Sequence, residues 1–236
     1  MSKILLGYWD LRGLGEPIRL MLEHAGADYV EKKYQHYKLA DGYDRTDWHS
    51  VKFSLGLAYP NLPYLIDGDV KVTESWAIMK YLSRKFEKLG PENEEERIKC
   101  DVTEGVVQDF RQGFTSMCYN PDFDFRKTYR DLCYNADFEK LKGAYTEGLP
   151  AKLDLFEKNI VLSGWLAGPK ITYVDFAFCE TLDEMRLTFP GCFDKHPNLL
   201  DYLERFNALE KIASYKCSDR FHQFPVNGKM AAWIGE

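Results

Sequence analysis

The first 36 residues follow the order strand, helix, strand, and this order strongly limits the fold. Residues 3–8 (KILLGY) are typical of a buried strand, residues 11–26 of a loop leading into a helix, and residues 28–35 (DYVEKKYQ) of a second strand. Pro17 suits the first turn of the helix and Gly26 suits its end. Strands joined by a helical crossover pair in parallel. The chain is therefore predicted to open with a β-α-β unit.

The pattern then changes along the chain. A polar loop leads to two short strands, 62–68 and 70–75, joined by the Asp67-Gly68-Asp69 turn, and a helix begins at Ser75. Beyond this point the sequence shows helical periods and no convincing strand. These periods cover residues 96–114, 147–160, 171–187 and 199–215. Thr172 and Asp175 form a predicted capping box at the start of the third of these helices. From residue 221 onward we expect an irregular tail over the surface. The predicted architecture is an α/β domain (βαβ–ββα) over residues 1–84, a linker over 85–91 and an all-helical domain over 92–236.

Composition excludes several classes of protein. The 236 residues carry a net charge of −6 with scattered basic residues, which argues against nucleic acid as the main partner. No apolar run approaches the ~20 residues of a membrane span, and the start lacks the pattern of a signal peptide. The six cysteines show no C-x-x-C pair and no zinc-like spacing with histidine. We therefore expect a cytoplasmic protein with reduced thiols and no metal site.

Two stretches could carry chemistry in the first domain. Tyr8 and Trp9 close the first strand, and the carboxyl end of a sheet strand is where catalytic groups gather; both residues could instead be interface aromatics. Pro63 enters a predicted strand, where it cannot donate a ladder hydrogen bond. It fits either a cis peptide, which would leave the backbone of Leu62 available to a ligand, or an edge strand.

Polar groups elsewhere in this domain suggest an anion site. The helix that starts at Ser75 presents backbone N–H groups and a hydroxyl, which suit a carboxylate, although Ser75 could equally be a plain N-cap. Arg45, Trp48 and Lys52 could lie on one side of a short helix, or on a solvated face. Together these groups outline a pocket with an aromatic hydroxyl, a backbone clamp and anion donors.

At this point the chain resembles the cytosolic glutathione S-transferases, and the mu class in particular. The resemblance rests on LGYWDLRGL, YDRTDW, KFSLGLAYPNLPYLIDG, TESWAI, ITYVDF and the tail SDRF…KMAAW, and it covers nearly the whole chain. The short stretch RQGF (111–114) is also similar to flatworm members. The resemblance implies a thioredoxin-like domain that binds glutathione, a helical domain that supplies most of the pocket for small hydrophobic electrophiles, and a homodimer. It implies no cofactor, because glutathione is a co-substrate.

The resemblance also implies roles for individual residues. The Tyr8 hydroxyl would stabilise the thiolate of glutathione, which is the nucleophile. The implied glutathione contacts are Trp9, Arg45, Trp48, Lys52, Asn61, Leu62 before a cis-Pro63, Glu74, Ser75 and, from the partner subunit, Asp109. Leu14 and Tyr119 would line the electrophile pocket, and Tyr59 would be the aromatic key that inserts into the partner. Glu74 departs from the glutamine usual in the class, and it places a like charge beside the γ-glutamyl carboxylate.

Two other functions remain open. A protein on the same fold could bind apolar compounds or haem with little or no turnover. The protein could also be a glutathione-dependent isomerase, although the mu-type polar loop argues against this function.

A tandem repeat complicates the assignment of two of these residues. Residues 109–123 (DFRQGFTSMCYNPDF) and 124–138 (DFRKTYRDLCYNADF) are identical at eight of fifteen positions. Asp124 and Tyr134 of the second copy therefore rival Asp109 and Tyr119. Pro121 is expected to end the incoming helix near residue 119 or 120, with the second copy absorbed as helical turns and surface loop. We therefore predict that the first copy is the functional one.

Overall fold

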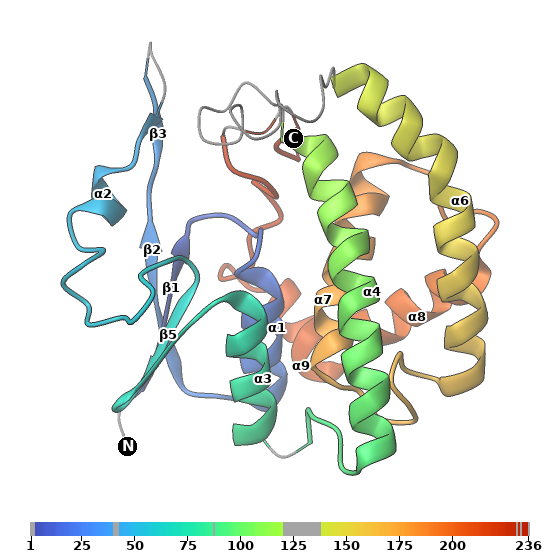
Figure 1. Ribbon diagram of the computed structural model, residues 1–236, viewed down its shortest axis with the longest axis horizontal. Helices are drawn as coiled ribbons and strands as arrows, with labels where there is room; N and C mark the ends of the chain where they lie inside the picture. The colour runs from blue at the N-terminus through green and yellow to red at the C-terminus, as the bar shows by residue number, and fades with distance from the viewer. Residues whose placement is uncertain are drawn as a thin grey trace. The chain divides into compact units, whose positions relative to one another are not determined.

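A computed structural model describes residues 3–39, 43–86, 88–119, 138–229, 231 and 233–235 (Figure 1). The chain divides into two compact units. The first comprises Met1–Gly90 and Asn207–Lys229, and the second comprises Pro91–Phe206 and Met230–Glu236. The segment Asn207–Lys229 therefore packs with the first unit, although it follows the helical part of the chain in sequence.

A four-stranded sheet forms the first unit, in the order β2-β1-β5-β6. Its strands are β1 (Ile4–Trp9), β2 (Tyr29–Tyr34), β5 (Tyr64–Asp67) and β6 (Val70–Thr73). β1 runs parallel to β2 and antiparallel to β5, which pairs in turn with β6. Helix α1 (Glu16–Ala25) links β1 to β2, and α3 (Ser75–Lys85) follows β6 (Figure 1). The predicted βαβ–ββα order is confirmed.

Local chemistry explains where these elements stop. Pro17 lies in the first turn of α1, where its missing N–H costs no hydrogen bond. Gly26 follows the helix in the left-handed conformation at φ 68°, and its N–H bonds back to the Glu23 carbonyl. Gly68 turns the β5–β6 hairpin at φ 61°. Each of these terminators was readable in the sequence.

The polar loop contains more structure than its composition indicates. It forms a small ribbon of β3 (Tyr37–Lys38) and β4 (Tyr43–Asp44), followed by a one-turn helix α2 (Thr46–His49). Sequence periodicity cannot reveal two-residue strands, because a period of two needs several residues to show.

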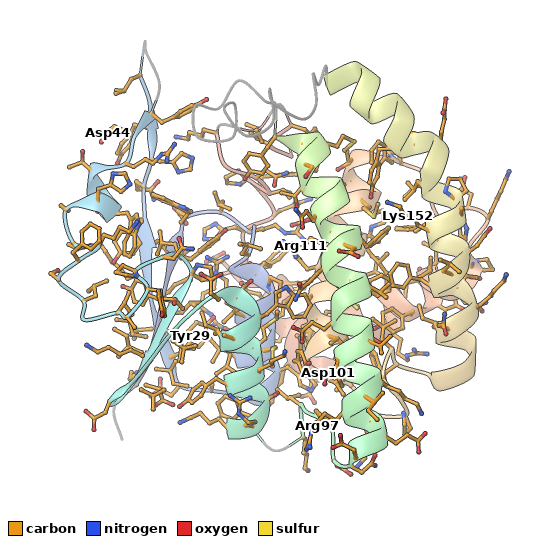
Figure 2. All side chains as sticks on the ribbon, in the orientation of Figure 1. Tyr29, Asp44, Arg97, Asp101, Arg111 and Lys152 are labelled. Atoms are coloured by element: carbon orange, nitrogen blue, oxygen red, sulfur yellow. The ribbon has the colours of Figure 1, made fainter. Side chains whose placement is uncertain are left out.

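Four helices make up most of the second unit. They are α4 (Glu94–Cys118), α6 (Phe138–Ser163), α7 (Tyr173–Thr188) and α8 (Pro197–Asn207). α7 is the core helix, because every residue from Tyr173 to Met185 is buried. Arg111, which is labelled in Figure 2, lies on α4. Its side chain is buried and pairs with Glu184 of α7, with 3.3 Å between Arg111 Nη2 and Glu184 Oε1. None of the helices among the described residues is long and apolar enough to cross a membrane.

The predicted capping box at the start of α7 is present. Oδ2 of the buried Asp175 carboxylate accepts from the Thr172 N–H at 2.7 Å and from its hydroxyl at 3.0 Å. Oδ1 accepts from the Leu166 N–H and from the Tyr202 hydroxyl. One carboxylate thus joins the start of α7 to α8 and to the loop before α7.

Two predictions about the C-terminal part need correction. The helical period over 199–215 is not one helix, because Leu209 adopts an extended conformation at ψ 124° and separates α8 from α9 (Glu210–Lys216). α9 then packs against α1 in the first unit. The described tail residues form neither helix nor strand, as expected, but the tail does not simply run over the surface. Val226 is fully buried and Asn227 is nearly so.

The first repeat copy ends the first long helix of the second unit. α4 stops at Cys118, and Tyr119 caps it in an extended conformation, which agrees with the predicted end near residue 119 or 120. The second copy, with Asp124 and Tyr134, lies outside the described residues except for Phe138, where α6 begins.

Candidate functional site

Tyr8 lies at the carboxyl end of β1, where the sequence predicted a catalytic group. Its side chain is buried, and its hydroxyl oxygen accepts a hydrogen bond from the Leu14 N–H at 3.0 Å. This bond uses one lone pair of the oxygen, and a hydroxyl group can accept and donate at the same time. The loop after β1 therefore holds the Tyr8 hydroxyl oxygen in place.

Two glycines let this loop approach the Tyr8 ring closely. A Cβ at Gly15 would lie 2.5 Å from Tyr8 Cδ1, and one at Gly13 would lie 2.7 Å from the Tyr8 hydroxyl. Gly13 also has φ +41°, which favours glycine. The glycines of LRGLG are thus explained by the packing of the loop on Tyr8.

A buried arginine holds the same loop from the other side. Arg19 of α1 donates to the Leu11 carbonyl at 2.8 Å, to Glu16 Oε2 at 3.0 Å and to Glu31 Oε1 at 2.6 Å. Its guanidinium carbon also lies 6.0 Å from the centre of the Tyr8 ring. Burial opposes the charge, but Glu16 and Glu31 more than offset it, so that the pKa of Arg19 is raised. Arg19 thereby ties α1, β2 and the loop after β1 together.

Pro63 is preceded by a cis peptide bond, as one of the two sequence interpretations proposed. The edge-strand alternative is wrong, because β5, which starts directly after Pro63, lies between β1 and β6. Pairing with β1 begins at Tyr64, opposite Gly7, so Leu62 precedes the paired residues. The aromatic rings of Tyr64 and Trp48 stack beneath this segment, 6.0 Å apart.

The start of α3 has an unusual backbone. Glu74, just before the helix, has φ 70° and ψ 120°, and among the described residues it is the one non-glycine with positive φ. Such strain persists where the surroundings enforce it, often at functional sites. Glu74, not Ser75, is the cap residue, so the interpretation of Ser75 as a plain N-cap is wrong; Ser75 is the buried first residue of α3. Asn61 Nδ2 donates to Glu74 Oε1 at 3.2 Å.

Arg45, Trp48 and Lys52, which were expected on one side of a short helix, have different surroundings in the structure. Arg45 is half-buried at the N-cap of α2, and burial lowers its pKa. Trp48 is buried in the core with Tyr34 and Tyr64. Lys52 lies after the helix with its ammonium 5.5 Å from the centre of the exposed Phe53 ring. Trp48 therefore packs into the unit, whereas the two cations remain nearer the surface.

The remaining predicted site residues lie on exposed or half-buried surface. Leu14 is 41% exposed and Tyr59 is 81% exposed in the first unit. In the second unit, Asp109 is exposed on α4 and Tyr119 is half-buried at its end.

Comparison with known proteins places this arrangement in a family. The model of the glutathione S-transferase N-terminal domain matches residues 5–84, and that of the C-terminal domain matches residues 123–219. Glutathione S-transferase Mu 2 of Mus musculus is 46% identical over 228 residues, which are 97% of each chain. The chain belongs to the glutathione S-transferase family.

Other relatives agree. Glutathione S-transferase Mu 1 of Oryctolagus cuniculus is 46% identical over 230 residues, covering 98% of both chains. The crystal structure of the glutathione S-transferase Blo t 8 superposes with a TM-score of 0.84 at 32% identity, covering 98% of this chain and 100% of that one. The protein is thus a glutathione transferase with mu-class similarity, a thioredoxin-like first domain and a helical second domain. It conjugates glutathione.

Sequence reasoning missed several residues around Tyr8 and Trp9. It singled out neither Arg19 nor His36, and it gave no role to Lys229, although Lys229 opens the family stretch KMAAW. Glu16, which also drew no attention as a structural residue, is fully buried and pairs with Arg19. The pair Gly13 and Gly15 could have indicated the packing of this loop on Tyr8, because closely spaced glycines are typical of a close approach of the backbone.

The close contact at Gly15 gives a first testable prediction. In Gly15→Ala the new methyl group must displace the Tyr8 ring, and a displacement of about 1 Å at a catalytic group costs up to ~100-fold. We expect kcat for glutathione conjugation to fall by about 10- to 100-fold. The matched control is Gly148→Ala in α6, where no described atom lies within 4 Å of the new carbon. Equal activity of Gly15→Ala and wild type would show that the Tyr8 ring need not be held there.

Proposed function

We propose that Tyr8 activates glutathione by donating its hydroxyl proton to the cysteinyl sulfur. The support is the place of the buried Tyr8 near the carboxyl end of β1, together with the hydrogen bond from the Leu14 N–H that holds its hydroxyl oxygen. A thiol with an ordinary pKa of ~8.5 is mostly protonated at neutral pH, whereas the thiolate is the nucleophile. The thiolate then attacks an electrophilic carbon of an apolar compound, forms the carbon–sulfur bond and displaces a leaving group with its electron pair.

The remaining glutathione contacts follow from the same proposal. Leu62 would pair its backbone with the cysteinyl part, next to cis-Pro63. The glycine end would lie against Trp9, Arg45, Trp48 and Lys52. The γ-glutamyl part would bind at the start of α3 through Asn61, Glu74 and Ser75. The strained backbone of Glu74 and its bond from Asn61 support a built site at this point.

Glu74 should accept from the γ-glutamyl ammonium without donating to the carboxylate. Its effect is therefore on glutathione affinity more than on turnover, because it lies away from the sulfur in this arrangement.

For the electrophile we propose Leu14 and Tyr119 as pocket residues, with the first repeat copy as the functional one. The supporting observation is that α4 is well formed up to Cys118 and capped by Tyr119. We expect Tyr119→Phe to change kcat or KM for the electrophile more than Tyr134→Phe does. Steady-state kinetics of the two variants, with the electrophile varied, make the comparison. A larger effect at Tyr134 would assign the role to the second copy.

We propose a homodimer in which Tyr59 inserts into the partner subunit and Asp109 reaches the partner's glutathione ammonium. Tyr59 is 81% exposed, a large aromatic surface to leave in water. On α4, Ile98, Val102 and Val106 follow at helical spacing and are 57%, 63% and 47% exposed. Such an apolar face is typical of a surface that a second subunit covers.

We further propose that the enzyme works in the cytoplasm without a metal or organic cofactor. The described cysteines are free thiols, which agrees with a reducing compartment. Nucleophilic attack by a thiolate needs no redox partner. The domain boundaries 1–84, 85–91 and 92–236 stay a prediction.

Conjugation of 1-chloro-2,4-dinitrobenzene to glutathione tests this function against the binding-protein alternative. Wild-type protein should give a rate that saturates with glutathione and lies well above the spontaneous reaction. Retention on glutathione resin and tight binding of apolar dyes, with no turnover above the spontaneous rate, would favour a binding protein instead.

A further inference from the structure

The C-terminal tail joins the two loops that flank Trp9. The Arg12 and Gly13 N–H groups donate to the carbonyls of Pro225 and Val226, both at 3.0 Å. Four residues beyond Pro225, the Lys229 N–H donates to His36 Nε2 at 3.0 Å. The Lys229 carbonyl accepts from the Tyr43 hydroxyl, also at 3.0 Å. The backbone of the tail is therefore fixed between the loop that carries Leu14 and the polar loop.

This arrangement places the His36 ring beside Trp9, with the Lys229 backbone N–H hydrogen-bonded to that ring. The buried His36 ring contacts the Trp9 ring edge-on, with the ring centres 5.3 Å apart. Burial, together with the positive charges of Lys229 and Arg45, lowers the pKa of His36. The lowered pKa favours the neutral ring. Because Nε2 accepts from the Lys229 N–H, the proton of the neutral ring lies on Nδ1, which can donate.

Nearby carboxylates are directed at backbone groups. Asp44 Oδ1 accepts from the Thr46 N–H, and Asp47 Oδ2 accepts from the Gln35 N–H, both at 2.8 Å. They hydrogen-bond within the polar loop and around α2. The Lys229 ammonium lies 5.7 Å from the centre of the neighbouring Tyr37 ring, and its positive charge and that of Arg45 both act on His36. A positive cluster beside an aromatic ring suits a carboxylate on a flat or extended ligand.

We propose that His36, Arg45 and Lys229 form a carboxylate-binding subsite next to Trp9, in which the C-terminal tail supplies one cation. This inference rests on the proposed function, because the carboxylate it binds belongs to one of the two substrates of that reaction. The carboxylate has two possible sources, the glycine end of glutathione or an anionic group on the electrophile. Of the three residues, the family resemblance implies a contact with glutathione for Arg45 only. We infer the roles of His36 and Lys229 from their contacts in this structure.

Lys229→Met tests the subsite, because it removes the charge while the Lys229 backbone bonds to His36 and Tyr43 can persist. Lys32→Met is the matched control. Lys32 resembles Lys229, because both are exposed lysines of the first unit with the ammonium near a tyrosine ring. The Lys32 ammonium lies 5.2 Å from the centre of the Tyr34 ring, and the Lys229 ammonium lies 5.7 Å from the centre of the Tyr37 ring. Two substrate pairs separate the sources. Glutathione is compared with its glycine ethyl ester, and 1-chloro-2,4-dinitrobenzene with 4-chloro-3,5-dinitrobenzoate.

We expect Lys229→Met to raise KM by about 3- to 5-fold for the carboxylate member of one pair, as for the loss of a partly exposed charge pair. KM for the neutral member, and kcat for both, should stay within about 2-fold. A change confined to the glutathione pair assigns the subsite to the glycine end, and a change confined to the other pair assigns it to the electrophile. The wild-type KM for that carboxylate substrate should also rise with salt, more steeply than in Lys229→Met.

Equal effects on the charged and neutral members of both pairs, or the same effects in Lys32→Met, would overturn the subsite while leaving glutathione conjugation intact. An absence of wild-type turnover with every substrate would instead overturn the proposed function, and the subsite with it.

Discussion

Tyr8→Phe should lower the rate of conjugation by about 5- to 50-fold at pH 6.5 and should no longer lower it above about pH 9. Without the hydroxyl, the bound thiol should return toward its ordinary pKa of ~8.5, which is ~2 units above the value expected for a stabilised thiolate and corresponds to roughly 2.7 kcal/mol. At pH 6.5 the ionised fraction then falls from about one half to about one hundredth. A more basic thiolate is intrinsically more nucleophilic, which offsets part of this loss.

The measurement is kcat/KM for the electrophile at saturating glutathione between pH 5.5 and 9.5. The lower limb of the profile should move to higher pH by up to ~2 units in Tyr8→Phe, and at high pH the rate of the variant should equal or exceed that of wild type. Tyr81→Phe is a suitable control, since the Tyr81 hydroxyl of α3 donates to Asp67 Oδ2 at 2.6 Å and has no role in the proposed site. Parallel profiles, with the same loss at every pH, would show that Tyr8 acts in some way other than through thiol ionisation.

Arg19→Met should be the most destabilising single change around the site. Glu16 and the Arg19 side chain are almost fully buried and paired at 3.0 Å, so removing the cation leaves a buried carboxylate uncompensated. Breaking one partner of such a pair typically costs ~3–5 kcal/mol. We expect a loss of this size in the free energy of unfolding, measured by denaturant titration at neutral pH.

Two further variants separate the causes. Arg19→Met combined with Glu16→Gln should recover part of the loss, because the uncompensated charge is gone. Arg97→Met is the surface control: Arg97, labelled in Figure 2, pairs with Glu94 at 2.9 Å while both side chains are more than half exposed. It should cost less than about 1 kcal/mol. A similarly small cost for Arg19→Met would show that the buried network does not hold the loop after β1.

Much of the first unit could be predicted because its signals are local. Alternating strands, Pro17 and Gly26 at the ends of α1, and the Gly68 turn each depend on neighbouring residues, and the structure confirms them. The family motifs likewise lie in continuous stretches. The position of Tyr8 at the end of β1 and the cis bond before Pro63 therefore followed from the sequence.

What escaped prediction depends on contacts between residues distant in sequence. Lys229 is hydrogen-bonded to His36, which lies 193 positions earlier in the sequence. Glu31, a partner of Arg19 on α1, lies on strand β2. The break between α8 and α9 follows from a single extended residue, Leu209, within an otherwise helical pattern. Periodicity along the chain records neither kind of information, because it reports which face is buried and not what covers it.

The central claim is that the Tyr8 hydroxyl stabilises the thiolate of bound glutathione. Titration of the enzyme–glutathione complex, followed by the ultraviolet absorbance of the thiolate, measures this pKa without any electrophile present. The account predicts a bound pKa of ~6.5 in wild type and a value near ~8.5 in Tyr8→Phe, with glutathione still bound in both. The same bound pKa in the two proteins would contradict it.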